Sequence, residues 1–86
     1  MDVRIPTPLR SYTDGRAVVT AAGTTVGEVL DDLDRRHPGI RFRMVDEQGR
    51  LREHMKVFVN LAAVRDLRIV VKDSDEVTIM QALSGG

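Results

Sequence analysis

One stretch near the middle of the chain has a clear helical pattern, and it constrains the fold more than any other feature. Apolar residues recur there at the spacing i, i+3, i+4 and i+7, and they are Val26, Val29, Leu30 and Leu33. Thr25 is a suitable N-cap, and Glu28 is placed to complete a capping box. Pro38 disfavours helical angles at His37, so we expect the helix to end there. The rest of the chain has to supply a sheet that buries this apolar face.

Two β-rich runs precede the helix. Residues 3–9 begin with alternating apolar and polar side chains, but Pro6 and Pro8 lack the backbone N–H that a sheet ladder needs. This first strand should therefore be short. Residues 16–22 form the second run, and residues 12–15 are predicted to form a turn because they end in Asp14-Gly15. Together the two runs predict an N-terminal hairpin.

The second half of the chain contains two clear strand patterns. Residues 55–60 alternate, with three apolar side chains on one face and Phe58 on the other, and residues 76–82 form the last strand. Phe58 lies either on the open face of the sheet or at a break in the register. The intervening segments are weaker. We expect an extended segment or short strand at 42–45, a turn at 46–49, an irregular connection at 61–68, a short strand at 69–71 and a turn at 72–75.

This order of elements predicts an α+β fold with a mixed sheet packed on one main helix. A hairpin followed by a crossover helix places the last strand beside the first, in the middle of the sheet. The expected domain is residues 1–86 as a single unit, in which the core holds the chain to about residue 82 and residues 83–86 form a flexible C-terminal tail.

The composition excludes several classes of function. The formal net charge is zero and only three residues, Tyr12, Phe42 and Phe58, are aromatic, which argues against a nucleic-acid partner. The chain has no cysteine, which excludes disulfides and thiolate metal sites. No segment has the length and hydropathy of a membrane span, so we expect no membrane partner and a cytoplasmic location.

No group of residues in the sequence predicts a self-contained active site. His37 and His54 have no metal-ligand spacing and are expected at the surface. Three acidic residues lie close together in the predicted helix, at positions 31, 32 and 34, but neighbouring helical residues diverge around the axis. A solvated helix face is the better interpretation, and we expect neither a metal site nor an enzyme.

The chain ends in Ser84-Gly85-Gly86 after an apolar run. Glycine has no Cβ, so two glycines can thread a narrow channel and leave the carboxylate of Gly86 accessible. A carboxylate is a poor electrophile until it is activated, for example as an acyl-adenylate. The alternative is that these glycines are only a frayed terminus.

Several segments, taken in this order, resemble the ubiquitin-like sulfur carriers of the MoaD/ThiS type, which have a β-grasp fold. The segments are Ile5-Pro6-Thr7-Pro8-Leu9-Arg10, His37-Pro38-Gly39, Val57-Phe58-Val59-Asn60, Val64-Arg65, Lys72-Asp73-Ser74-Asp75-Glu76-Val77-Thr78-Ile79 and the terminal Ser84-Gly85-Gly86. The resemblance spans almost the whole chain. It departs from the family pattern where Leu61 follows Asn60 and Ser74 follows Asp73, because glycine is common at both positions.

The resemblance implies a mechanism in which partners supply the catalysis. An adenylating enzyme of the ubiquitin-activating type would use MgATP to convert the Gly86 carboxylate to an acyl-adenylate, and this chain would itself bind no cofactor. A rhodanese-like donor or sulfide would then produce a thiocarboxylate, which passes its sulfur to a synthase. By the same resemblance, Gly85 and Ser84 thread the partner, and the predicted contacts with partners are Phe58, Leu61, Met80 and Leu83.

The segment 44–52 is longer than thiamine-type carriers usually have, and it resembles the carrier of protein-bound cysteine biosynthesis in actinobacteria. The small subunit of molybdopterin synthase and a carrier for a sulfur-containing secondary metabolite remain alternatives. A ubiquitin-like modifier that forms isopeptide bonds with target lysines is a further alternative from a different class.

Overall fold

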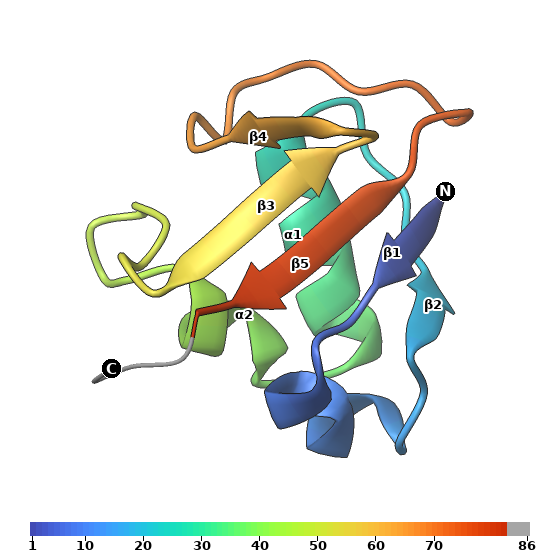
Figure 1. The fold of residues 1–86 in the computed structure, drawn as a ribbon, viewed down its shortest axis with the longest axis vertical. Helices are drawn as coiled ribbons and strands as arrows, with labels where there is room; N and C mark the ends of the chain where they lie inside the picture. The colour runs from blue at the N-terminus through green and yellow to red at the C-terminus, as the bar shows by residue number, and fades with distance from the viewer. Residues whose placement is uncertain (83–86) are drawn as a thin grey trace.

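The computed structural model describes residues 1–82. In this part of the chain, five strands form one mixed sheet in the order β2-β1-β5-β3-β4 (Figure 1). The strands are β1 (Asp2–Arg4), β2 (Val18–Thr20), β3 (Met55–Val59), β4 (Ala62–Val64) and β5 (Val77–Gln81). The helices are α1 (Val26–Arg36), α2 (Ile40–Met44) and the 3-10 helix η1 (Thr7–Thr13). The predicted α+β class and the single main helix are confirmed.

The last strand, β5, lies in the middle of the sheet, as the order of elements predicts (Figure 1). It runs parallel to β1, with Val3 opposite Val77, and antiparallel to β3, with Val57 opposite Ile79. The N-terminal pair β1 and β2 is antiparallel, which confirms the predicted hairpin pairing. Strand β3 pairs with β5 along its whole length, up to the pairing of Gln81 with Met55, whereas β1 pairs with it only at Val77 and Thr78.

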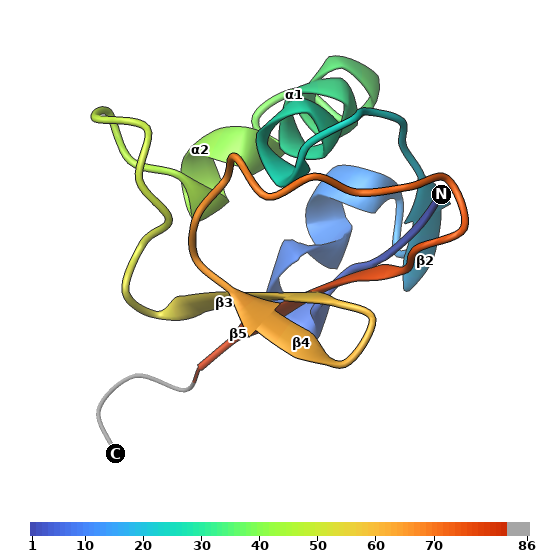
Figure 2. The ribbon, with the colours of Figure 1, turned by 90° about the horizontal axis from the view of Figure 1, so that it is seen from above.

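The core lies between α1 and one face of the sheet (Figure 2). The four residues of the helical stripe, from Val26 to Leu33, are fully buried. The sheet contributes alternate residues of its strands, and those of the central strands are Val3, Met55, Val57, Val77 and Ile79. Burial of these apolar side chains is the main term that stabilises a domain of this size.

Helix α1 begins as its sequence predicts, with one difference. The Thr25 hydroxyl accepts a hydrogen bond from the backbone N–H of Glu28, at 3.1 Å. A capping box would have the Glu28 carboxylate return to the N–H of Thr25, but it accepts instead from the N–H and hydroxyl of Thr24, at 2.9 and 2.7 Å. These bonds favour the ionised form and lower the pKa of Glu28.

The connection between β1 and β2 differs from its prediction. The first strand, predicted to be short or bulged near its end, is indeed short and ends at Arg4. The chain then forms η1, and the turn predicted over residues 12–15 is limited to Asp14 and Gly15. Pro6 is the N-cap and Pro8 lies in the first turn. The fixed φ of proline near −65° suits a helical turn, and Leu9 anchors η1 in the core.

Helix α2 replaces the extended segment predicted at 42–45. Its end residues Ile40 and Met44 are both buried, which is a helical i, i+4 spacing. One oxygen of Asp34, in α1, accepts hydrogen bonds from the N–H groups of Gly39 and Arg41, each at 3.1 Å. Hydrogen bonds to Asp34 of the preceding helix therefore stabilise this short helix, whose own sequence has only a weak helical pattern.

The region after β3 also differs from its prediction. The predicted irregular connection at 61–68 contains the edge strand β4, in which Ala63 pairs with Phe58. The predicted strand at 69–71 makes only one isolated bridge, between Val70 and Thr25. The N–H groups of the first turn of a helix have no partner within the helix. The N–H of Val26 in α1 donates to the carbonyl of Ile69 in this segment, at 2.9 Å. The segment therefore stabilises the start of α1 and does not extend the sheet.

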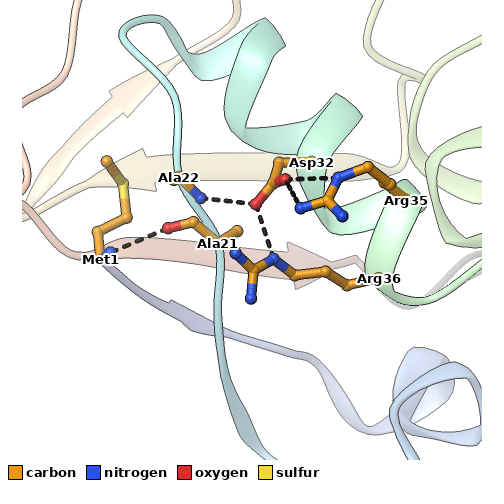
Figure 3. Close-up of polar contacts among 6 residues, drawn as sticks. All are labelled: Met1, Ala21, Ala22, Asp32, Arg35 and Arg36. Atoms are coloured by element: carbon orange, nitrogen blue, oxygen red, sulfur yellow. Dashed lines mark hydrogen bonds and ion pairs between the residues drawn. The ribbon is translucent and has the colours of Figure 1, made fainter.

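Asp32 makes more contacts than a solvated helix face implies. Its carboxylate accepts a hydrogen bond from the N–H of Ala22 at 2.9 Å and pairs with Arg35 and Arg36 (Figure 3). The Arg35 guanidinium, the Ala22 N–H and the Arg36 guanidinium together lower the pKa of Asp32 to about 2. The adjacent Ala21 carbonyl accepts from the amino group of Met1 at 2.9 Å. Asp32 therefore joins α1 to the strand end, and it is structural rather than catalytic.

Candidate functional site

The point where the chain leaves the sheet defines the candidate site. The N–H of Ala82 donates to the carbonyl of His54 at 2.7 Å, immediately after the last residue of β5. We name this point the tail root. The predicted reacting residue Gly86, the predicted threading residues Gly85 and Ser84, and the predicted contact Leu83 lie outside the residues that the structure describes. Their roles stay predictions, and the structure describes the surface around the tail root.

The sheet face opposite α1 and α2 is not covered by either helix (Figure 2). Side chains on this open face alternate with the core residues of the same strands, and in β5 they are Thr78 and Met80. Met80 lies opposite Lys56, and Thr78 lies between Phe58 and Arg4. Phe58 therefore occupies the open face, and the register of β3 is unbroken.

Three of the four predicted contact residues lie together on this face. Phe58, Leu61 and Met80 line one shallow hollow, together with Asn60 and Thr78. Leu61 is 96% exposed and Met80 is 50% exposed, which is unusual for large apolar side chains. The hollow provides apolar surface of the kind that partners bury. The binding role of these residues stays a prediction.

A second hollow on the same face was not anticipated from the sequence. It lies between η1 and β5, and Pro6, Pro8, Arg10 and Met80 contribute to its walls. Thr78 and Met80 lie between the two hollows, because each borders both. The sequence signal for this hollow was the pair of prolines after β1, because they end the strand and begin η1 beside the open face.

The edge of the open face is fixed by a polar network around Asn60. Its side chain donates to Asp75 at 3.0 Å and accepts from the N–H of Glu76, also at 3.0 Å. Hydrogen bonds from the N–H of Lys72 and from Asn60 lower the pKa of Asp75. Glu76 in turn pairs with Arg4 at 2.9 Å. The network joins the β3–β4 turn to the start of β5 and thereby positions Leu61.

The departure from the family pattern at Leu61 has a structural explanation. Within residues 1–82, the β3–β4 turn needs a positive φ only at Asn60, where φ is 54°, and asparagine tolerates this conformation. No residue from Asp73 to Asp75 has a positive φ. Neither turn therefore requires the glycine that is common in the family.

The other predicted absences concern metals and membranes. Residues 1–82 contain no cluster of three or more His, Asp or Glu side chains that could hold a metal ion. Over the same residues, no helix is long and apolar enough to cross a bilayer. His54 is exposed and His37 partly so.

The strand order, the single main helix and the central last strand define the class of ubiquitin-like β-grasp proteins. The chain belongs to the ThiS family, whose match extends over residues 3–86. The match covers nearly the whole chain and includes the tail, so the resemblance in the sequence is confirmed.

Individual relatives agree with this assignment. The sulfur carrier protein CysO of Mycobacterium tuberculosis is 39% identical over 89 residues, which cover 98% of this chain and 96% of that protein. A crystal structure of the BexX/CysO complex of Amycolatopsis orientalis contains a chain that is 44% identical, with a TM-score of 0.92 and coverage of 99% of this chain and 98% of that one. These relationships support the role of a sulfur carrier rather than an enzyme.

A third relative has a different name. The small archaeal modifier protein 1 of Haloferax volcanii is 27% identical, with a TM-score of 0.78 and coverage of 96% of this chain and 97% of that one. The same fold thus occurs in a protein that is named a modifier.

Proposed function

We propose that this chain carries sulfur as a thiocarboxylate on Gly86. The main support is the family match through residue 86 together with the identity to a sulfur carrier over nearly the whole length of both chains. The composition adds a chemical reason, because the chain has no cysteine. Without a thiol, the carboxylate is the group through which the chain can hold transferable sulfur.

The proposed reaction has two steps, and partner enzymes catalyse both. An adenylating enzyme of the ubiquitin-activating type joins the Gly86 carboxylate to the AMP part of MgATP and releases pyrophosphate. Sulfide attacks the acyl carbon, and AMP leaves. If the persulfide of a rhodanese-like donor attacks instead, the departure of AMP leaves an acyl disulfide, and a reducing thiol cleaves its S–S bond to release the thiocarboxylate. The product is the thiocarboxylate, which passes its sulfur to an acceptor bound on a synthase. We place these steps in the cytoplasm.

The structure indicates what this chain contributes to these steps. The pairing of β5 with β3 up to Gln81 and the hydrogen bond from Ala82 to His54 hold the tail root in place. The hollow lined by Phe58, Leu61 and Met80 is the proposed docking surface for the enzymes, and Leu83 is a further proposed contact. The chain thus provides an acyl group at a fixed origin, and its partners provide the catalytic groups.

Intact-mass spectrometry tests the proposal. The chain is incubated with a candidate adenylating enzyme, MgATP and sulfide, and a chain lacking Gly86 serves as the control. We expect a mass gain that matches replacement of one oxygen by sulfur in the full chain alone. No gain with enzymes that are active on their own carriers would contradict the proposal.

The acceptor decides the pathway. We favour cysteine biosynthesis because the CysO relatives cover the whole chain. Molybdopterin synthesis and a sulfur-containing secondary metabolite are the other acceptor pathways. The thiocarboxylate form is incubated with a cysteine-forming synthase and its acceptor substrate and, separately, with the large subunit of molybdopterin synthase and its acceptor substrate. Loss of the thiocarboxylate mass, either to an adduct with the acceptor or to the carboxylate, shows which enzyme takes the sulfur.

Covalent protein modification is the second candidate function, because the modifier from Haloferax volcanii shares the fold and 27% of the sequence. In that case Gly86 would form isopeptide bonds with lysines of target proteins. Trypsin cleaves after Lys72, the last basic residue, so it would leave residues 73–86 on each modified lysine. Target peptides that carry this remnant in cells expressing the full chain, and not in cells expressing the chain without Gly86, would support it.

A further inference from the structure

A cluster of arginines lies beside the tail root, on the α2 side of the sheet. Arg52 is held in place by two contacts with Phe42. Its Nε donates to the Phe42 carbonyl at 2.9 Å, and its guanidinium carbon lies 4.8 Å from the centre of the Phe42 ring. Phe42 is itself 57% exposed. The ring and the carbonyl therefore orient the guanidinium at the surface, where the cation–π contact favours this orientation.

Arg43 follows Phe42 in α2 and is also exposed. Phe42, Arg43, Arg52 and His54 line one shallow pocket, which we name the tail-root pocket. The link to the tail root is direct, because the carbonyl of His54 accepts the N–H of Ala82 at 2.7 Å. Any partner that takes hold of the chain beyond Ala82 approaches this pocket.

The two arginines of the pocket differ from most others in how they are paired. Among residues 1–82, neither Arg43 nor Arg52 forms an ion pair with a carboxylate. Six other arginines do, and the pairs are Arg4 with Glu76, Arg35 and Arg36 with Asp32, Arg41 with Asp31, Arg50 with Asp46, and Arg68 with Asp66. The zero net charge of the chain thus conceals a local positive excess at the tail root.

Nearby charges do not cancel this excess. Lys56 is exposed two residues beyond His54, opposite Met80 on the open face. Glu53 is next to the pocket in the sequence, and within residues 1–82 it is in no ion pair.

Asp46 is the second carboxylate nearby. Hydrogen bonds from the N–H groups of Arg50 and Gln48 and the charges of Arg50 and Arg52 lower its pKa, and its ion pair is with Arg50. Even when both carboxylates are counted, four cationic side chains stand against two, and they are Arg43, Arg50, Arg52 and Lys56.

The length of the tail requires a partner to come close to the pocket. Four residues follow Ala82, and a fully extended chain spans at most about 3.6 Å per residue, or roughly 14 Å in all. An enzyme that encloses the Gly86 carboxylate has to bring its surface within that distance of Ala82. Because the tail-root pocket adjoins Ala82, it meets the rim of the channel that the tail enters.

We propose that the tail-root pocket docks on a carboxylate-bearing rim of the adenylating enzyme, with Arg43 and Arg52 each pairing with an Asp or Glu of that enzyme. Arginine presents a planar set of N–H donors that matches a carboxylate, and such bonds are among the stronger ones in interfaces. The exposed ring of Phe42 adds apolar contact between the two charges. This inference rests on the proposed function, since it requires a partner that receives the tail.

Charge reversal tests the proposal in the adenylation reaction. Arg43→Glu is the cleanest variant, because Arg43 makes no side-chain hydrogen bond within residues 1–82, and Arg52→Glu and the double variant extend it. Arg16→Glu is the matched control, since Arg16 is an exposed arginine located before β2. Thermal unfolding verifies that each variant is folded.

We expect Arg43→Glu to raise the KM for the carrier about tenfold with little change in kcat, because charges at an interface act mainly on association. The KM of the unmodified chain should rise with salt, and that of the double variant should depend on salt much less. An unchanged KM for Arg43→Glu, or an equal rise for Arg16→Glu, would overturn the proposal.

A second probe does not depend on the enzyme. The ¹⁵N-labelled chain is titrated with a synthetic octaglutamate peptide at low salt, and the amide shifts are followed by NMR. We expect the largest shifts at residues 42–43, 52–54 and 82, and their loss in the double variant. Equal shifts around Arg16 would refute a selective pocket. If no enzyme adenylates the unmodified chain, the proposed function fails, while the peptide experiment still decides whether the pocket prefers carboxylates.

Discussion

At the scale of single residues, side chains that cap helices or bridge segments fix the local structure. Thr25 caps α1 through the N–H of Glu28, and Asp34 caps α2 from a neighbouring helix. Asp32 accepts one backbone and several guanidinium hydrogen bonds. Each of these side chains satisfies donors that would otherwise need water, and each contribution can be measured by substitution.

Thr25→Ala should lower the free energy of unfolding by about 1 kcal/mol, since it leaves an N–H of the first turn of α1 without its acceptor. Chemical denaturation measures the change. Thr7→Ala is the control, because Thr7 is exposed and its side chain makes no hydrogen bond within residues 1–82. Equal effects of the two substitutions would contradict the assigned cap.

Asp32 should make stability depend on pH in the acid range. Its pKa falls from 3.8 to about 2 in the folded chain, so the unfolded chain binds a proton first as the pH is lowered. The contribution is therefore complete above about pH 5 and is lost as the pH falls toward 2.

Asp32→Asn should remove this part of the acid dependence and lower stability at neutral pH. Urea unfolding between pH 2 and pH 6 measures both effects, and Asp73→Asn is the control because Asp73 makes no ion pair within residues 1–82. The assignment fails if the two variants have the same pH profile.

At the scale of elements, the two faces of β5 have different roles: one contributes to the stability of the core, and the other to the proposed docking surface. Val77 and Ile79 are buried against α1, whereas Met80 is half exposed between the two hollows of the open face. The alternation of a strand assigns neighbouring residues to different tasks. One strand therefore carries both the core and the proposed partner surface.

Ile79→Val should lower the free energy of unfolding by about 0.5–1.5 kcal/mol, because it removes a buried methylene. Met80→Ala should change it by well under about 1 kcal/mol, as substitutions at exposed positions do. The order should reverse in the adenylation reaction, where Met80→Ala is expected to raise the KM for the carrier. A large loss of stability in Met80→Ala would place that side chain in the core instead.

At the scale of the whole molecule, the fold and the reacting end are separable. Within residues 1–82, the last buried core residue is Ile79, and the last backbone hydrogen bond joins Ala82 to His54. Strand β5 is paired within the sheet up to Gln81, before the tail begins. Stability and sulfur transfer should therefore respond independently to truncation.

A chain that ends at Ala82 should keep its free energy of unfolding to within about 0.5 kcal/mol, because every core residue described within residues 1–82 is retained. The same chain should gain no sulfur with an adenylating enzyme, MgATP and sulfide. Denaturation and intact-mass spectrometry measure the two properties on one sample. A clear loss of stability would show that the tail belongs to the fold.

Local patterns in the sequence determined α1, the strands β3 and β5, and the central place of the last strand. Each depends on a period of 3.6 or 2 that a few neighbouring residues express, and chain connectivity then restricts the topology. The tail motif, on which the proposed chemistry rests, was also visible in the sequence, because it needs only residue types in order.

Only the tertiary structure decided η1, α2, β4 and the role of residues 67–71. These segments are short, and their hydrogen-bond partners belong to other elements, as when Asp34 of α1 caps α2 or the Ile69 carbonyl accepts from the distant Val26. The hollow beside Met80 and the unpaired arginines at the tail root likewise arise from residues that are distant in sequence. These residues come together only when distant segments pack, and local periodicity in the sequence does not reveal that packing.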